Sequence, residues 1–405
     1  MTPNELRIKS LVLVDVGPFS RLDIQFNPKA GINLICGGNG IGKTTILESI
    51  VAGFSQGRNH RIKRRQPANS GMINIDYLYN REDRSIRLDV KTFDPEKGDF
   101  SHNQHGLSEN IINVRASRDF SYLKQTNISR DPDFDQKSFG QKFAQDANSS
   151  EIKSWLTNRY LLQHHADKSS WTPQMRDNLK TAVSFFSLLD DNFKLEEVDV
   201  RTFDILVSTP SGIIPFELLS SGFRSAYALL LGILKEIEFR QLEVSAHDFS
   251  GVILVDEIDL HLHPTWQQSI GLILKNAFPN AQVIATTHSP HVIQTAQAEE
   301  VISLSLEADG SVVPRSIMST QYGYIGWTIE EILEDIMGVE DTRTPAFREA
   351  MLNFDAALDT GDSESLLASL SVLKNMLHPD NPLQKILDIQ SAPYIGARVD
   401  GEAGR

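Results

Sequence analysis

One segment, residues 37–44, constrains the fold of this chain more than any other. It reads Gly-Gly-Asn-Gly-Ile-Gly-Lys-Thr and fills every fixed position of the phosphate-binding pattern Gly-x-x-x-x-Gly-Lys-[Ser/Thr]. A short apolar run at 31–36 precedes it and predicts a buried strand, and a run with helical spacing at 45–53 follows it. Strand, glycine-rich loop and helix in this order predict a site for a nucleoside triphosphate.

The residue types of this loop suit a phosphate for a physical reason. Glycines let the backbone bend so that successive N–H groups and the start of the helix point at an anion. Lys43 is predicted to reach the β- and γ-phosphates of ATP, and Thr44 to hold Mg²⁺. An ordinary glycine-rich turn is the alternative, but such a turn has no need of Lys43 and Thr44 in this register. The predicted nucleotide-binding residues of the loop are Gly37, Asn39, Gly40, Ile41, Gly42, Lys43, Thr44 and Thr45.

Composition limits the class of protein. The 405 residues carry a formal charge of −14, with 40% hydrophobic and 23% charged residues, which is typical of a globular protein. No apolar run reaches the roughly 18 residues that a transmembrane helix needs, and the N-terminus lacks the apolar core of a signal peptide. The single cysteine, Cys36, excludes an internal disulfide, and its place in a predicted strand favours a buried thiol. We therefore expect a cytoplasmic protein.

A basic run at residues 58–65 stands out in this acidic chain. A solvated loop is the default interpretation of such a run, and contact with nucleic acid or another acidic partner is the alternative. The net charge of −14 argues against a chain that coats nucleic acid uniformly, because phosphate contact depends on clustered cations. The candidate nucleic-acid contacts are Arg58, Arg61, Lys63, Arg64 and Arg65.

The pattern along the chain predicts four regions. Strand-like segments dominate residues 1–119, helical patterns fill an insert at 120–195, strands and helices alternate over 196–320, and amphipathic helices make a C-terminal appendix at 321–405. Helices of about 15 residues in the insert would span only some 20 Å, too little for a long coiled-coil arm. Near-continuous apolar runs at 251–256 and 281–286 predict central strands of a parallel sheet, with a crossover helix at 264–277 between them.

Two acids, Asp256 and Glu257, follow the first of these central strands. An acid at the carboxyl end of a central strand lies beside the phosphate loop, where Asp256 can hold Mg²⁺ together with Thr44. Glu257 can polarise the water that attacks the γ-phosphate. A capped turn is the alternative for two adjacent acids, but the phosphate loop makes it the weaker one.

Two further segments belong to the same predicted site. Residues 219–225 precede a helix, where Ser220 or Ser221 can cap the helix and Gly222 allows close approach, so this helix start is a second anion site. His288 follows the second central strand and therefore lies at the same sheet edge as the two acids. A structural role is the usual one for a single histidine, but this position favours function.

In these ordered motifs the chain resembles ATP-binding-cassette ATPases, specifically the SMC-like, RecF-like and OLD-like head domains that serve no transporter. The resemblance covers residues 1–60 and 200–305. It implies an α/β fold with a mixed central sheet, an antiparallel β subdomain, a short helical insert and a C-terminal helical appendix. It also implies that Ser220, Ser221 and Gly222 bind the γ-phosphate of ATP held by a second subunit. The implied catalytic base is Glu257, and the implied γ-phosphate sensor is His288.

The chain departs from the family pattern in places. The signature segment has Ser221 where transporters usually have Gly, and Phe-Arg where they have Gln. The glutamine loop is expected near 113–120, which holds no obvious glutamine but two arginines, Arg115 and Arg118. Residues 259–264 read Asp-Leu-His-Leu-His-Pro and match the loop after the acidic strand in OLD-like ATPases. Its two histidines suggest either a metal site or, as we favour, structural packing at the dimer seam.

Three functions follow from the resemblance. The favoured one is an ATPase of prokaryotic anti-phage defence, like the ATP-binding proteins of Septu, retron-associated and PARIS systems. It would hydrolyse ATP slowly with Mg²⁺, pair head to tail through composite sites as a homodimer or larger oligomer, and control an effector, a nuclease encoded nearby. The alternative is a DNA-repair ATPase of RecF or SMC type that clamps DNA. A transporter motor is disfavoured, because 177 positions separate Lys43 from Ser220 and no membrane partner is indicated.

Overall fold

The computed structural model describes residues 4–55, 57–101, 107–118, 122, 124–128, 131, 149–163, 171–240, 242–318 and 320–402. It divides the chain into two compact units, Met1–Val339 and Glu340–Arg405. The four regions predicted from the sequence, with boundaries at 119/120, 195/196 and 320/321, stay predictions. None of the described helices is both long enough and apolar enough to cross a membrane.

A six-stranded sheet forms the centre of the first unit, in the order β15-β14-β3-β13-β12-β8. The five strands from β14 to β8 run parallel, and only β15 is antiparallel to its neighbour. The sheet is therefore mixed, and the α/β class predicted from the sequence is confirmed. The strands are β3 (Gly31–Gly37), β8 (Ile111–Val114), β12 (Val252–Val255), β13 (Gln282–Thr286), β14 (Val301–Leu306) and β15 (Val312–Pro314).

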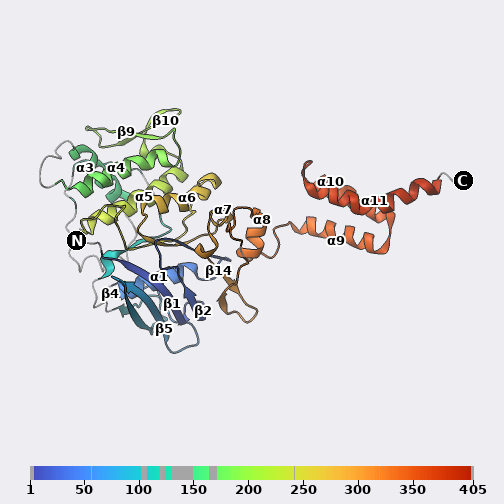
Figure 1. The fold of residues 1–405 in the computed structure, drawn as a ribbon, viewed down its shortest axis with the longest axis horizontal. Helices are drawn as coiled ribbons and strands as arrows, with labels where there is room; N and C mark the ends of the chain where they lie inside the picture. Colours follow the sequence, from blue (N-terminus) through green and yellow to red (C-terminus); the bar gives the residue numbers. More distant parts are fainter. Residues whose placement is uncertain are drawn as a thin grey trace. The chain divides into compact units, whose positions relative to one another are not determined.

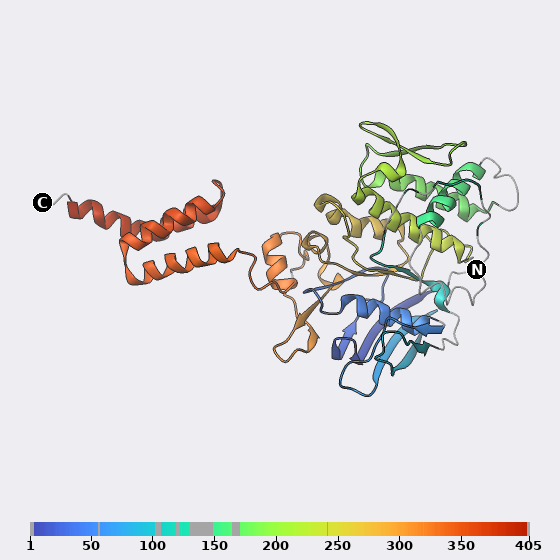
Figure 2. The same cartoon turned by 180° about the vertical axis from the view of Figure 1, so that it is seen from behind.

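Both faces of this sheet are covered, which explains its continuous apolar strands. On β12, Ile253 and Val255 belong to one hydrophobic core, and Val252 and Leu254 belong to a second. This alternation follows from the two-residue period of a strand. The core that contains Ile253 and Val255 lies between one face of the sheet and a layer of helices. The core that contains Val252 and Leu254 lies on the other face, where a second sheet packs (Figures 1 and 2).

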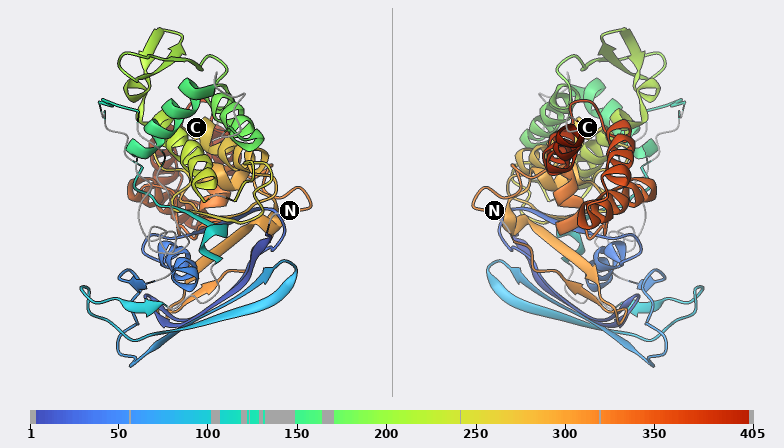
Figure 3. Two further views of the ribbon diagram at one scale, coloured as in Figure 1. Left: turned by 90° about the vertical axis from the view of Figure 1, so that its left-hand side faces the viewer. Right: turned by 90° about the vertical axis from the view of Figure 1, so that its right-hand side faces the viewer.

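An antiparallel sheet in the order β2-β1-β5-β6 and helix α1 make up the second core. Helix α1 contacts β3 and β13 of the central sheet and also β5 and β6. In Figure 3 the antiparallel strands lie on the opposite side of α1 from the helices α3–α6. The elements are β1 (Leu6–Val16), β2 (Phe19–Gln25), α1 (Lys43–Phe54), β5 (Gly71–Tyr79) and β6 (Glu82–Val90), with a small pair β4 (Gly57–Asn59) and β7 (Asp99–Ser101) nearby in the chain.

Helices and a small sheet cover the other face. Helix α5 packs on β8, α6 packs on β3, and α3 and α4 pack on α5. A three-stranded sheet in the order β11-β10-β9 contacts α3 and α4 through β9. The helices are α3 (Ser149–Leu162), α4 (Pro173–Leu188), α5 (Ser221–Phe239), α6 (Pro264–Ala277) and α7 (Pro290–Gln294), and the strands are β9 (Lys194–Val198), β10 (Ile205–Thr209) and β11 (Gly212–Pro215).

A local turn at Asp199 precedes strand β10. Asp199 accepts hydrogen bonds from the backbone N–H groups of Arg201 and Thr202, at 2.7 and 3.3 Å. This local turn competes with strand pairing, so β10 begins only at Ile205. Short elements complete the unit: the 3₁₀ turns η1 (Leu107–Asn110), η3 (Phe216–Leu218) and η4 (Ala298–Glu300), the helical turn α8 (Ile329–Glu331) and the π-helical turn η5 (Ile332–Ile336).

The second unit consists of three helices, α9 (Pro345–Thr360), α10 (Ser363–Met376) and α11 (Pro382–Glu402). Each contributes to a small core that contains Phe354, Leu373 and Leu387. Gly361 adopts a left-handed conformation after α9, and the Asp362 carboxylate caps α10. The amphipathic patterns that the sequence shows towards its C-terminal end therefore correspond to helices in the structure.

Candidate functional site

Three strand ends meet at the carboxyl edge of the central sheet. Strand β3 lies beside β13, and β13 lies beside β12. Backbone hydrogen bonds continue this pairing past the strands: the Thr287 N–H donates to Ile35, and the Ile258 N–H donates to Thr286, at 3.1 and 2.9 Å. The loops after β3, β12 and β13 therefore lie together, at the edge where parallel α/β sheets bind ligands.

The phosphate loop needs its glycines. Gly37, Gly40 and Gly42 have φ values of +143°, +73° and +100°, which residues with a side chain rarely adopt. A Cβ atom at Gly37 would lie 2.5 Å from the carbonyl oxygen of Leu304, and one at Gly42 would lie 2.5 Å from the ring of Phe19. The backbone shape predicted from the pattern is therefore held by close packing.

Lys43 is a buried cation with neutral partners. Its ammonium group donates hydrogen bonds to the carbonyl oxygens of Gly37 and Gly38, at 2.8 and 2.9 Å. Burial lowers the pKa of Lys43, because the charged form has lost water. A phosphate group would supply the missing negative charge, so the loop fits an anionic ligand.

Thr44 and Asp256 bring a hydroxyl and a carboxylate together. The Thr44 Oγ1 donates to the two carboxylate oxygens of Asp256, at 3.2 and 3.0 Å. A hydroxyl and a carboxylate are oxygen ligands of the kind that Mg²⁺ prefers, and Mg²⁺ usually keeps several waters beside phosphate oxygens. The pair predicted as the metal site therefore fits Mg²⁺ bound with a nucleotide.

Thr286 links the two acids that follow β12. Its hydroxyl donates to the Asp256 carboxylate at 2.6 Å and accepts the backbone N–H of Glu257 at 2.7 Å. Glu257 itself has a φ of +50°, a strained value for a residue with a side chain. Thr286 thus ties β13 to the acidic segment after β12.

Arg118 holds the same acidic segment from the other side. One terminal nitrogen of its guanidinium donates to the backbone carbonyl oxygens of Asp256 and Glu257. The other, Nη1, is buried and has no hydrogen-bond partner in the described part of the chain. Burial lowers the pKa of Arg118 to about 10, and the nearby acids, Asp259 first, counteract part of this shift. Arg118 is therefore charged at neutral pH, and its Nη1 group is an unused hydrogen-bond donor beside the site.

His288 and Asp259 follow the same edge. The Asp259 carboxylate accepts hydrogen bonds from the Thr287 hydroxyl at 2.6 Å and from the backbone N–H of His288 at 3.2 Å. Partial burial, and then the charge of Lys43, lower the pKa of His288 and favour the neutral imidazole. The structure therefore brings His288 into the electrostatic field of Lys43 and of the acids after β12.

The predicted signature segment begins helix α5. Ser220 occupies the N-cap position, yet its side chain makes no capping hydrogen bond in the structure as described, and Ser220 and Ser221 are exposed. A Cβ atom at Gly222 would lie 2.9 Å from the carbonyl oxygen of His261, so this glycine lets the loop after β12 approach closely, whereas close approach of an anion stays a prediction. The Ser225 hydroxyl donates to Leu260 at 2.8 Å. The signature segment is thus joined to the loop at 259–264.

The remaining predicted loop residues have varied surroundings. Asn39 is exposed, Ile41 is buried in the core beside the antiparallel sheet, and Thr45 packs against Gly17. His263 caps helix α6, its ring nitrogen accepting the Thr265 N–H at 3.4 Å. Among the described residues no group of three or more His, Cys, Asp or Glu side chains is arranged to hold a metal ion.

Much of the basic run at 58–65 is engaged within the chain. Lys63 donates to backbone carbonyl oxygens at 94 and 97, and Arg64 donates to carbonyl oxygens at 68 and 91. Arg61 forms an ion pair with Glu48 at 3.6 Å. These contacts order the loop, and nucleic-acid binding by the run stays a prediction.

The sequence pattern singles out Arg115 and Arg118 but predicts a role for neither. Arg115 forms a buried bidentate pair with Glu48 of α1, at 2.8 and 3.2 Å, and so joins the segment after β8 to the helix after the phosphate loop. The available signal is the presence of two arginines in the segment 113–120, where the glutamine loop is expected. Thr286 was missed too, because a threonine in an apolar strand carries no motif of its own.

Comparison with known proteins places the chain in a family. Residues 32–294 match the family described as "AAA domain, putative AbiEii toxin, Type IV TA system". The chain belongs to this family. It is 38% identical over 396 residues to the Septu protein PtuA of Bacillus thuringiensis, an alignment that covers 96% of this chain and 98% of the relative. This AAA-domain protein is also 24% identical over 464 residues to the retron Ec83 probable ATPase of Escherichia coli, covering 91% and 84%.

Among solved structures, the AAA-domain chain matches the Smc head domain with an extended coiled coil from Pyrococcus furiosus, bound to the C-terminal domain of ScpA. The TM-score is 0.45 and the identity 14%, over 77% of this chain and 96% of that one. The resemblance to Septu and retron-associated ATPases stated from the sequence motifs is therefore confirmed by sequence similarity over most of the chain.

Proposed function

We propose that this AAA-domain protein binds ATP with Mg²⁺ and hydrolyses it to ADP and phosphate. The observation that carries the proposal is that Thr44, directly after Lys43 in the segment that follows strand β3, meets Asp256, directly after strand β12, at the carboxyl edge of the parallel strands. Lys43 would neutralise the β- and γ-phosphates, and Thr44 and Asp256 would hold Mg²⁺. The bound ion would spread the negative charge that develops on the phosphates.

Glu257 is the proposed general base, which accepts a proton from the attacking water. It follows Asp256 directly, and both Thr286 and Arg118 hold its backbone in place. A base must be positioned before its pKa matters, and a strained, doubly held peptide is a means of positioning. His288, neutral at pH 7 by its lowered pKa, is the proposed contact to the γ-phosphate.

The second half of the ATP site is proposed to come from a second copy of the chain. Ser220 and Ser221 are exposed at the start of α5, a helix of 19 residues with no acid in its first turn. Such a helix start attracts an anion. In a head-to-tail pair, Ser220, Ser221 and Gly222 of one copy would bind the γ-phosphate on the phosphate loop of the other, so ATP would hold the two copies together.

We also propose that the paired ATPase controls an effector protein in anti-phage defence, and that this effector is a nuclease encoded nearby. The support is the 38% identity over 96% of the chain to a Septu protein and the similarity to a retron ATPase. Co-purification of the chain with the product of the adjacent gene tests this step. A stable complex that ATP alters supports it, and a neighbour with a role in replication would instead point to DNA repair.

The substitution Glu257→Gln tests the catalytic step. It keeps the size and hydrogen-bonding shape of the side chain but removes the base, so ATP binding should persist while phosphate release falls by about 10²-fold or more. Phosphate release and ATP binding are measured on the same preparation. Exposed Glu364 of the second unit gives a matched control, Glu364→Gln, which should leave both quantities unchanged. Turnover at the wild-type rate in Glu257→Gln would remove Glu257 from this role.

A further inference from the structure

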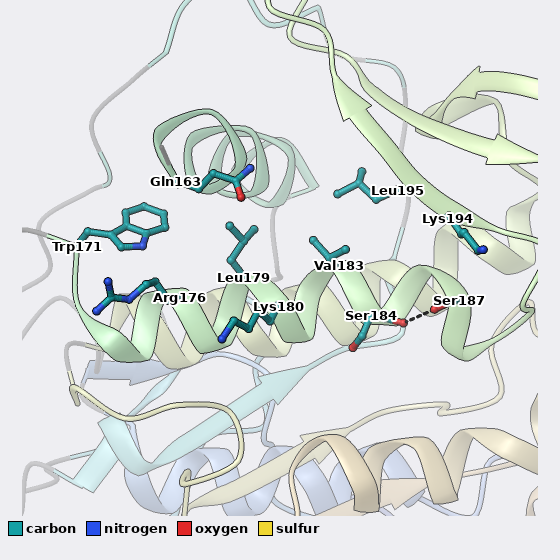
Figure 4. Close-up of a pocket in the computed structure, with 10 residues that line it drawn as sticks. All are labelled: Gln163, Trp171, Arg176, Leu179, Lys180, Val183, Ser184, Ser187, Lys194 and Leu195. Carbon is teal, nitrogen blue, oxygen red and sulfur yellow. Dashed lines mark hydrogen bonds between the residues drawn. The ribbon is translucent and has the colours of Figure 1, made fainter. Parts of the chain in front are cut away.

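A cavity of about 580 Å³ opens in the helical insert, between α4, the end of α3 and strand β9. Figure 4 shows side chains from these three elements around one space. Its volume lies within the range of small-molecule sites, about 300–1,000 Å³. Nothing in the proposed ATP site uses these residues.

One face of α4 supplies the floor of the cavity. Along α4 the lining residues are separated alternately by three positions and by one position, so they lie on one face of the helix. Leu179 and Val183 point from α4 toward Leu195 of β9 in Figure 4. Val183 is 37% exposed although it is apolar. An apolar ligand on this floor would remove apolar surface from water, which favours binding.

The rim of the cavity is positively charged. Arg176, Lys180 and Lys194 line it, and none of the lining residues drawn in Figure 4 is acidic. In a chain of net charge −14 this is an unusual local balance. Asp177 lies 3.5 Å from the Lys180 ammonium on the same helix, whereas Arg176 and Lys194 have no ion pair among the described residues. The charges favour an anion.

Trp171 adds an aromatic side chain to the lining. Its side chain is 8% exposed, and its indole N–H is buried without a hydrogen-bond partner in the part of the chain that the structure describes. Because this N–H is buried, the apolar part of the ring is what Trp171 offers to a ligand in the cavity.

We propose that this cavity binds a small anionic molecule with a flat apolar body. The body lies on Leu179, Val183 and Leu195 beside the Trp171 ring, and the anionic group meets Lys180 and its neighbours. A nucleoside monophosphate and an aromatic sulfonate share this chemistry.

Helix α3 connects the cavity to the signature segment. Gln163, directly after α3, lines the cavity. Further along α3, the Lys153 ammonium pairs with Glu217 at 2.6 Å and with Asp204 at 2.8 Å, and all three groups are largely buried. Glu217 lies three residues before Ser220, so a ligand that shifts α3 acts on the start of α5. This regulatory step rests on the proposed function, whereas ligand binding does not.

Binding is tested in the Lys43→Ala protein, which removes the phosphate-loop cation, with adenosine 5′-monophosphate and 8-anilino-1-naphthalenesulfonate as separate probes. Fluorescence titration and the four tryptophan indole N–H signals in NMR are the readouts. We expect at least one probe to bind and to shift one indole signal, which is absent in Trp171→Phe. Lys180→Glu should raise the Kd about tenfold or more, whereas Lys29→Glu, an exposed charge reversal outside the cavity, should not.

Three outcomes would overturn the site: no binding of either probe, binding that Lys180→Glu leaves unchanged, or an unaffected Trp171 signal. The regulatory step is measured separately, as ATP turnover of the wild-type chain with and without the bound probe. An unchanged rate under saturating probe would overturn the coupling through α3. A wild-type chain without any ATP turnover would contradict the proposed function and leave the binding result standing.

Discussion

Replacing Arg118 by Gln should slow ATP turnover more than it weakens ATP binding. Arg118 donates to the backbone carbonyl oxygens of Asp256 and Glu257 with one nitrogen of its guanidinium. The shorter glutamine, with a neutral amide, cannot reproduce both contacts. The peptide of Glu257, whose φ is +50°, then loses one of its two supports. Because Lys43 and Thr44 keep their own contacts, the affinity for ATP should change little.

The size of the effect follows from these two hydrogen bonds. A hydrogen bond from a charged donor contributes about 1.5–3 kcal/mol. One nitrogen serves both carbonyls, so we take about 2 kcal/mol for the pair together, near the lower limit. If this energy is lost from the positioning of Glu257, kcat falls about 30-fold, with KM changed less than about threefold.

Steady-state phosphate release at varied ATP concentration measures both parameters. Arg118→Lys keeps a cation that can reach one carbonyl, so it should recover part of kcat. Arg84→Gln, at an exposed arginine of β6, is the matched control and should behave as wild type. A lowered melting temperature with unchanged kcat would contradict this role, because Arg118 would then stabilise only the fold.

Three further predictions concern single residues. Gly222→Val adds a Cβ atom 2.9 Å from the carbonyl oxygen of His261. It should abolish ATP-dependent pairing, measured by sedimentation, while ATP binding persists. The control Gly326→Ala adds a Cβ atom in open space and should change neither pairing nor ATP binding. Cys36 is fully buried and its pKa is raised to about 12 by that burial, so about one thiol in ten thousand is ionised at pH 8 and reaction with a thiol reagent should wait for unfolding; rapid labelling of the native chain would contradict this. Tyr227→Phe deletes a buried 2.8 Å hydrogen bond to a carbonyl of α4. It should lower the free energy of unfolding, measured by urea denaturation, by about 1–2 kcal/mol. An unchanged denaturation midpoint would contradict this prediction.

The local parts of the fold and site could be predicted from the sequence. The phosphate loop, the strands that end before Asp256 and His288, and the helix after 264 all have patterns contained within a few residues. The rule that carboxyl ends of parallel strands share one sheet edge then placed Lys43, Asp256 and His288 together. In the structure, Thr44, directly after Lys43, and Thr286, two residues before His288, both donate hydrogen bonds to Asp256.

The parts that depend on long-range packing could not be predicted. The contact of Arg118 with Glu257 joins residues 139 positions apart, and no local pattern reports it. Strand β9 is rich in charged residues and has no apolar alternation, so its pairing with β10 went unpredicted. The cavity at Trp171 exists only because α3, α4 and β9 pack around it.

In the proposed assembly, ATP joins two copies of the chain, and each copy gives half of a site. Lys43→Ala removes the phosphate-binding half, and Ser220→Arg blocks the signature half. Each variant alone should be inactive, but an equal mixture should form pairs with one intact site, in which Lys43 of one copy faces Ser220 of the other. Statistical mixing in a symmetric dimer then restores about a quarter of the wild-type phosphate release. A mixture as inactive as the separate variants would contradict the head-to-tail site.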